Sequence, residues 1–154
     1  MPDELERLKQ IADFFRRMNS KLLLLKLLDK AKEEYETLDF VNGKASLYEA
    51  LKLDETNPVT LRGLGCMEQF EGNFQKAKEY FFKALENSSR KEIEYTLLGM
   101  VYYFEDNLDS AVKYFNMAID SNIDYDKAYE GRNQAMLENH LKVIDLQESL
   151  KKYF

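Results

Sequence analysis

The sequence repeats itself with a period of 34 residues, and this period constrains the fold more than any other feature of the chain. A shift of 34 positions, without insertion, aligns small and apolar residues with one another: Leu64-Gly65 with Leu98-Gly99, Phe74 with Leu108, Ala77 with Ala111, Tyr80-Phe81 with Tyr114-Phe115, and Ala84-Leu85 with Ala118-Ile119. One period earlier, the same register holds more weakly at Phe40, Gly43, Leu47 and Ala50-Leu51. Such a period indicates stacked supersecondary units, each too small to bury its own apolar face.

Each unit is predicted to be a pair of helices. Apolar residues follow helical spacing in the second half of a unit, at Ala77, Tyr80-Phe81 and Ala84-Leu85. Asn57-Pro58 is a typical helix start, with asparagine as the cap and proline in the first turn. Gly72-Asn73 and Asp106-Asn107 mark turns between paired helices. Because the chain has only six Gly and two Pro, few other breaks are expected.

In these residues the chain resembles the tetratricopeptide-repeat family. The pattern of that family is a 34-residue helix–turn–helix with an aromatic residue, Leu-Gly and Tyr, followed by Ala, Phe and Ala. The third repeat matches it most fully, with Tyr95, Leu98-Gly99, Tyr102, Ala111, Phe115 and Ala118. The second repeat has Leu61, Leu64-Gly65, Glu68, Ala77, Phe81 and Ala84, and the first has Leu27, Ala31, Glu34, Gly43, Leu47 and Ala50. The usual closing Pro is replaced by Glu55, Ser89 and Ile123.

The resemblance implies an all-α, right-handed antiparallel helical solenoid in a single domain. Its parts are an N-terminal helix over 3–20, repeats over 24–57, 58–91 and 92–125, and a C-terminal capping helix or helices over 126–154. Asn19-Ser20 is expected to break the N-terminal helix and to cap a second one over 21–38. Terminal units of solenoids usually shield the exposed core, so both flanks are interpreted as caps. The alternative is that one flank forms a partner interface or a homodimer.

The resemblance further implies a protein–protein interaction module, an adaptor or scaffold that binds a peptide or helix of a partner in its concave groove. Helical spacing predicts the lining of that groove on the first helix of each repeat. The predicted residues are Val59, Arg62, Cys66, Gln69, Phe70, Ile93, Thr96, Met100, Tyr103, Phe104, Lys127, Glu130, Gln134 and Leu137, with Leu28, Lys32 and Tyr35 extending the groove upstream. The competing interpretation is that some of these residues are core or lie beneath the terminal helix.

A subset of the family grips the terminal carboxylates of a peptide with Lys, Asn and Arg on the same helices. The matching positions here are Arg62, Cys66, Leu97, Lys127 and Gly131. Only Arg62 and Lys127 are cationic, and the Asn positions are lost. The resemblance therefore does not extend to a carboxylate clamp.

Composition excludes several other functions. One Cys (Cys66) and one His (His140) allow neither an intrachain disulfide nor a Cys- or His-based metal site, and no phosphate-binding glycine loop occurs, so we expect no enzyme, no metal and no cofactor. The net charge of -6 argues against a nucleic-acid partner. The apolar run Leu22–Leu28 is interrupted by Lys26 and is shorter than the ~20 residues of a spanning helix. We therefore expect a cytoplasmic protein without membrane insertion.

The charge is uneven along the chain. Residues 58–91 contain six Lys or Arg and four acids, whereas residues 92–125 contain one Lys and seven acids. Acids at Glu92, Glu94 and Asp109 suit the starts of helices, which is the simpler explanation. The alternative is an acidic rim that attracts a basic partner segment.

Two further functions remain open from the sequence. In its size, its acidity and its extra N-terminal helix, the chain also resembles the secretion chaperones of bacterial type III systems. Those chaperones hold an unfolded client segment in the groove. In that case residues 3–18 would carry dimerisation. The other alternative is a structural subunit whose groove is filled by residues 140–154, through Val143, Leu146, Leu150 and Phe154.

Overall fold

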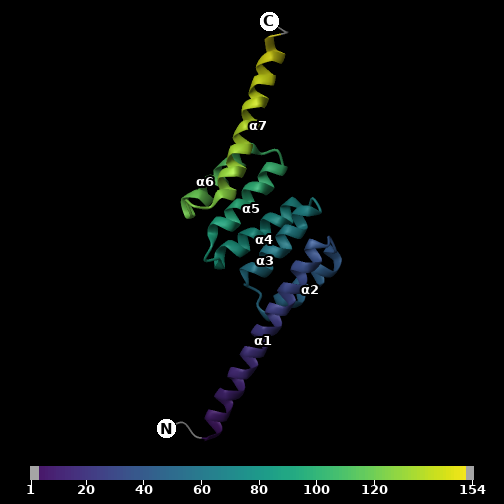
Figure 1. Ribbon diagram of the computed structural model, residues 1–154, viewed down its shortest axis with the longest axis vertical. Helices are drawn as coiled ribbons and strands as arrows, with labels where there is room; N and C mark the ends of the chain where they lie inside the picture. Colours follow the sequence, from purple (N-terminus) through teal and green to yellow (C-terminus); the bar gives the residue numbers. More distant parts are fainter. Residues whose placement is uncertain (1–3, 152–154) are drawn as a thin grey trace.

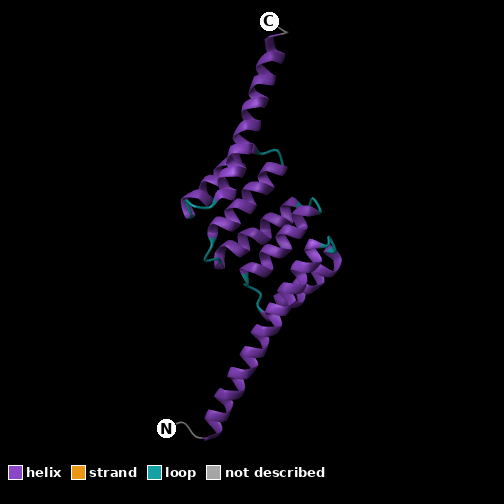
Figure 2. Ribbon diagram, in the orientation of Figure 1, coloured by secondary structure: helices purple, strands orange, loops and turns teal. Residues whose placement is uncertain are grey.

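The computed structural model describes residues 4–151, which form seven α-helices and no strand (Figures 1 and 2). The helices are α1 (Glu4–Glu36), α2 (Phe40–Leu53), α3 (Pro58–Phe70), α4 (Phe74–Asn87), α5 (Lys91–Phe104), α6 (Leu108–Ser121) and α7 (Asp126–Lys151). Helices α1 and α2, α3 and α4, and α5 and α6 pack as pairs, and α7 packs on α6 and α5. The predicted all-α solenoid is confirmed.

The core lies in layers between the helix pairs rather than at one centre. Phe81 of α4 packs with Leu98 and Val101 of α5 in one layer, and Phe115 of α6 packs with Ala135 of α7 in the next. Both phenylalanine rings are buried. Each unit therefore buries its apolar face against its neighbour, as the 34-residue period predicts.

Close helix crossings explain the small residues of the repeat. A Cβ placed on Gly99 would lie 2.8 Å from Cδ1 of Phe115, and one on Gly131 would lie 2.5 Å from Cε1 of the same ring. The Phe115 ring thus fills the space between two glycines, one on α5 and one on α7. No larger residue fits at either position without displacing a buried ring.

The turn inside each pair has one geometry, repeated at intervals of 34 residues. Leu38, Gly72 and Asp106 have φ values of 60°, 81° and 63°. The backbone N–H of each donates to the carbonyl oxygen three residues earlier, at 3.0 Å in all three turns. The sequence marks two of these turns, at Gly72-Asn73 and Asp106-Asn107. It does not mark the first, where leucine occupies a left-handed conformation that glycine would adopt without strain.

Replacing Leu38 with Gly is therefore expected to raise the free energy of unfolding by about 0.5–1 kcal/mol. The side chain is largely exposed, so little packing is lost. Replacing Gly72 with Ala should lower the free energy of unfolding by about 1 kcal/mol, because it places a Cβ on a residue in the same left-handed conformation. Urea unfolding followed by circular dichroism measures both. A stability loss in the Leu38→Gly variant would show that the leucine side chain, and not its backbone strain, dominates.

The helix break predicted at Asn19-Ser20 is wrong. Helix α1 runs without interruption through both residues, so residues 3–20 are not a separate helix. Asn and Ser lower helix propensity by only about 0.5 kcal/mol each, and no Gly or Pro occurs between residues 3 and 42. The leucine-rich run that follows favours the helix strongly, so these weak signals do not end it.

The two terminal helices project from opposite ends of the packed body (Figure 1). Only the second part of α1 and the first part of α7 are packed, with Ala31 buried on one and Ala128 and Ala135 on the other. Residues 4–23 and 141–149 are exposed throughout. No helix among residues 4–151 combines the length and the apolar character needed to cross a membrane.

Candidate functional site

Three adjoining hollows run along the first helices of the repeats. The first, of about 440 Å³, lies between α1, α2 and α3, and the second, of about 460 Å³, lies between α1, α3, α4 and α5. The third, of about 180 Å³, lies between α5, α6 and α7. Tyr35 and Cys66 line both the first and the second, and Met100 and Phe104 line both the second and the third. We call this continuous depression the groove.

The structure brings most of the predicted groove residues together. Lining residues predicted from the sequence are Leu28, Lys32, Tyr35, Val59, Arg62, Cys66, Gln69, Phe70, Met100, Tyr103, Phe104 and Gln134. Helical spacing within a known repeat register is sufficient to identify them, because the register fixes the side of the helix that each residue occupies.

The middle of the groove has aromatic walls. Phe70 packs against Phe40 with 4.8 Å between ring centroids, and Phe104 stacks on Phe74 at 6.5 Å with nearly parallel rings. Phe70 remains 59% exposed and Phe104 56% exposed. These rings are held in place on one side and open to solvent on the other, which is the arrangement of an anchor site for an apolar side chain.

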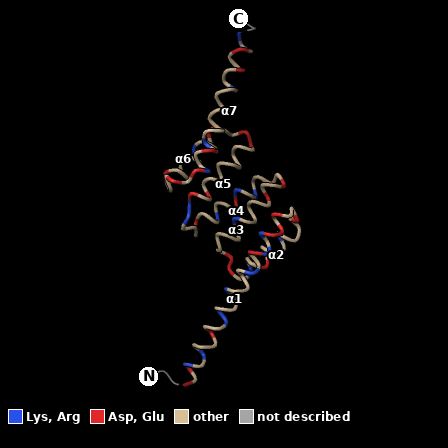
Figure 3. The backbone as a smooth tube through the Cα atoms, in the orientation of Figure 1, with Lys and Arg blue, Asp and Glu red and all other residues tan. Residues whose placement is uncertain are grey.

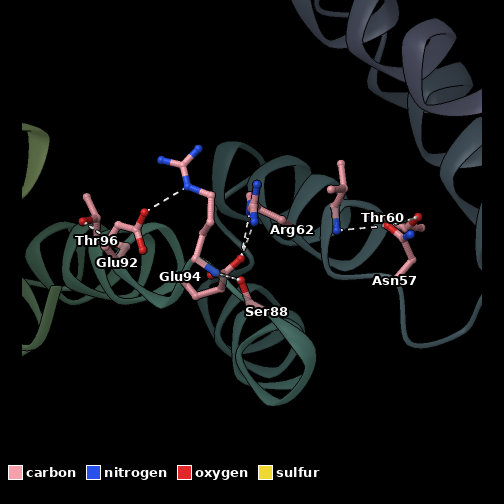
Figure 4. A network of polar contacts seen from close by, with 9 residues as sticks. Asn57, Thr60, Arg62, Ser88, Glu92, Glu94 and Thr96 are labelled. Carbon is pink, nitrogen blue, oxygen red and sulfur yellow. Dashed lines mark hydrogen bonds and ion pairs between the residues drawn. The ribbon is translucent and has the colours of Figure 1, made fainter. Parts of the chain in front are cut away.

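Arg62 lies in the groove wall, but its guanidinium is occupied. Its Nε and one terminal nitrogen donate to Oε1 of Glu94, at 2.9 and 2.6 Å, across the boundary between the second and third repeats (Figure 4). The Glu94 side chain is fully buried and that of Arg62 is 22% exposed. Arg62 therefore joins two repeats instead of offering a cation to a bound carboxylate.

Cys66 is an apolar part of the wall. Burial raises the pKa of its thiol to about 11, in spite of the opposing effect of the Arg62 guanidinium. The pKa is raised because desolvation disfavours the charged thiolate. At neutral pH the group is a protonated thiol and a poor nucleophile.

Five predicted residues do not line the three hollows, among them Leu137, which is exposed on α7. Thr96 is buried, and its hydroxyl donates to the carbonyl oxygen of Glu92 at 2.8 Å, so its prediction as a groove residue is wrong. Ile93 is half-buried outside the hollows, and Lys127 and Glu130 are exposed on α7. The third hollow reaches α7 only at Gly131 and Gln134, so the start of α7 lies outside the groove.

The predicted groove did not include six apolar lining residues: Ala31, Leu47, Met67, Phe74, Leu97 and Phe115. Leu47 and Phe74 belong to second helices, which were not expected to reach the groove. Phe74 is the first residue of α4, directly after the turn at Gly72, and from there it reaches the second hollow. Its position two residues after a turn glycine was the available signal.

The last helix does not fill the groove. Within the part of the chain that the structure describes, α7 contacts α5 and α6 but not α3, and residues 141–149 are exposed. Only its first half approaches the groove, where the Glu138 carboxylate raises the pKa of the Tyr103 phenol. The interpretation of residues 140–154 as a groove-filling segment is therefore wrong for 140–149. The side chain of Leu150, and Phe154, lie outside the described residues.

The acidic excess of the third repeat is largely neutralised by neighbouring cations. Its ion pairs are Glu92 with Arg90 at 3.0 Å, Glu94 with Arg62 at 2.6 Å, Glu105 with Lys78 at 2.8 Å, and Asp106 with Lys142. Three of these cations come from the second repeat, which carries the basic excess. The uneven charge of the sequence thus pairs one repeat with the next, and four of the seven acids that could have formed the alternative acidic rim are held in ion pairs.

Among residues 4–151, no three His, Cys, Asp or Glu side chains are grouped so that they could hold a metal ion.

Comparison with known proteins identifies the fold as that of the tetratricopeptide-repeat proteins. The sequence model of the tetratricopeptide repeat matches residues 95–122, and no curated protein sequence matches the chain. A crystal structure of MamA is similar over 100% of this chain and 99% of its own, with 18% identity and a TM-score of 0.67. The first tetratricopeptide-repeat domain of Spaghetti (RPAP3), bound to an HSP90 peptide, covers 76% of this chain and 93% of its own, with 14% identity and a TM-score of 0.68.

Two other similar structures differ in the share of their own length that this chain spans. The Yersinia enterocolitica type III secretion chaperone SycD, in complex with a peptide of the translocator YopD, covers 75% of this chain and 94% of its own, with 13% identity and a TM-score of 0.67. An O-GlcNAc transferase of Thermobaculum terrenum has a TM-score of 0.71 at 20% identity, but this chain spans only 22% of its length. At these identities the likeness establishes the fold.

Proposed function

We propose that this chain, whose fold is that of the tetratricopeptide-repeat proteins, is a non-catalytic protein–protein interaction module that binds a peptide or helix of a partner in the groove. The observation that carries the proposal is the row of exposed, preformed apolar side chains at Phe70, Met100 and Phe104 in the middle of the groove. Two similar structures contain a bound peptide, which supports the same use of the fold.

The lining favours an apolar segment of the partner. Cys66 is uncharged at neutral pH, and the guanidinium of Arg62 is held by Glu94. Recognition therefore rests on burial of apolar or aromatic anchors between the Phe70 and Phe104 rings. Because these rings are already packed against Phe40 and Phe74, little side-chain order has to be created on binding.

Replacing Met100 with Glu tests the proposal, because it places a carboxylate where the second and third hollows meet. A library of random peptides displayed on phage is selected against the unaltered chain, and the affinities of selected peptides are measured by fluorescence polarisation. We expect the variant to bind them roughly tenfold more weakly or worse. The matched control is Val41→Glu, which adds the same charge to an exposed residue of α2 outside the hollows.

Equal affinities in the Met100→Glu and Val41→Glu variants, with helicity retained in both, would contradict binding in the groove. Failure to select any peptide that competes for the groove would count against the proposal as well.

A second candidate is a secretion-chaperone-like protein that holds an unfolded client and dimerises through residues 3–18. The similarity to SycD with its translocator peptide favours it over other specialised roles. Sedimentation equilibrium of the full chain and of a chain lacking residues 3–18 distinguishes the two. The chaperone alternative requires a dimer that the deletion abolishes while peptide binding persists.

A further inference from the structure

The first five turns of α1 form a helix without a partner in the structure. Residues 4–23 are exposed on every side, and Figure 1 shows this segment extending away from the packed repeats. An isolated helix in water gains nothing from packing, so a segment this rich in apolar residues requires a surface to cover it. We call residues 4–23 the N-terminal arm.

The arm has one apolar face. At 100° per residue, the exposed apolar residues fall on one side that spans about half of the helix circumference: Leu5, Leu8, Ile11, Phe14, Phe15, Met18, Leu22 and Leu23. Their side chains are between 47% and 59% exposed. A face of this width exceeds the narrow seam through which two helices pair as a coiled coil.

The charges of the arm are ordered around this face. Lys9 and Arg16 lie along one of its edges, and Arg7 and Lys21 lie along the other, whereas Asp13 lies near the centre of the polar side. Residues 4–23 contain five Lys or Arg and three acids, a net charge of +2 in a chain whose total is -6. Figure 3 shows these cations distributed along the projecting part of α1.

We propose that the N-terminal arm binds the surface of an anionic lipid membrane, with its helix axis in the plane of the surface and its apolar face among the acyl chains. Long cationic side chains at both edges of the face reach the lipid phosphates while their methylene groups remain in the apolar layer. Glu6 and Asp13 lie on the side that faces water, and Glu4, the first residue of the helix, lies at the end of the apolar face. This placement is interfacial, so it differs from the membrane insertion that the sequence led us to exclude.

The charges also argue against two other surfaces that could cover the apolar face, namely the arm of a second copy of the chain and the groove of a second copy. Pairing the arm with a second copy of itself brings together two segments that each carry +2. The groove of a second copy offers little compensation, because Glu94, Glu105 and Asp106 beside it are held by cations of the same chain. Among the described residues that line the three hollows, Asp29 is the one acid without an ion pair. A surface of uniform negative charge complements the arm along its whole length.

Flotation of the full chain with vesicles tests the proposal. We expect it to float with vesicles of equal parts phosphatidylglycerol and phosphatidylcholine, to float roughly tenfold less with phosphatidylcholine alone, and to dissociate as salt is added. Phe15→Asp should abolish flotation by placing a charge in the apolar face. Its matched control is Ser20→Asp, which makes the same change of charge on the polar side and should float nearly as well as the unaltered chain.

Absence of flotation, equal flotation with both kinds of vesicle, or equal loss in the two Asp variants would overturn the proposal. A concentration-dependent dimer that Phe15→Asp dissociates, without flotation, would assign the arm to a protein partner instead. The Met100→Glu variant should float normally, so a failure here is separable from a failure of the groove proposal. Circular dichroism confirms that each variant is folded.

Discussion

Replacing Gly99 with Leu should unfold the repeat array, or lower its free energy of unfolding by roughly 3 kcal/mol or more. Even the first carbon of the new side chain would lie 2.8 Å from the Phe115 ring. That ring is 1% exposed and also packs against Gly131 of α7, so it cannot shift without disturbing a second helix crossing. Because small domains are stable by only about 5–15 kcal/mol, such a loss is a large part of the total.

Thermal and urea unfolding followed by circular dichroism measure this effect. The diagnostic comparison is a pair of variants, Gly99→Ala alone and Gly99→Ala combined with Phe115→Leu. If the clash with the ring is the cause, the smaller side chain at 115 should recover part of the loss, so the two effects will not add. A stable Gly99→Leu variant would show that the helix crossing is looser than the structure indicates.

Replacing Arg62 with Ala should cost about 3–5 kcal/mol, because it leaves the buried Glu94 carboxylate without its cation. Within the described residues, Oε2 of Glu94 already has no hydrogen-bond partner, so Oε1 carries the whole interaction. The double variant Arg62→Met with Glu94→Met should recover most of this loss, since it removes both charges and retains the volume.

Arg90 provides the matched control. It pairs with Glu92 at 3.0 Å but is 61% exposed, so Arg90→Ala should cost less than about 1 kcal/mol. The measurement is urea unfolding at neutral pH. Similar losses in the Arg62→Ala and Arg90→Ala variants would mean that burial of the Glu94 pair is not what makes it important.

The repeat units could be predicted from the sequence because their signals are local and recur. Gly99 and Ala111 must be small wherever two helices cross, so the same residue types return every 34 positions. Asn57 was identified as a helix cap for the same reason, and in the structure its side chain accepts hydrogen bonds from the N–H groups of Val59 and Thr60. A register fixed by such residues also orients most of the groove.

What the sequence missed depends on contacts between repeats. Arg62 was interpreted as a groove cation, yet its partner Glu94 lies 32 residues away, and only the stacking of α3 on α5 brings the two together. The same stacking pairs Lys78 with Glu105 and so removes much of the acidic rim. Thr96 was assigned to the groove by its helical angle, but its burial depends on the packing around α5. Long side chains that cross a repeat boundary leave no periodic signal.

The continuity of α1 makes its two ends one rigid body. The helix has 33 residues, a length of about 50 Å, and it includes both the exposed arm and Tyr35 of the groove wall. Any surface that holds the arm therefore fixes the direction in which the groove opens, since no hinge separates the two. A helix broken at Asn19 would have acted as a flexible tether, whereas this one sets an orientation.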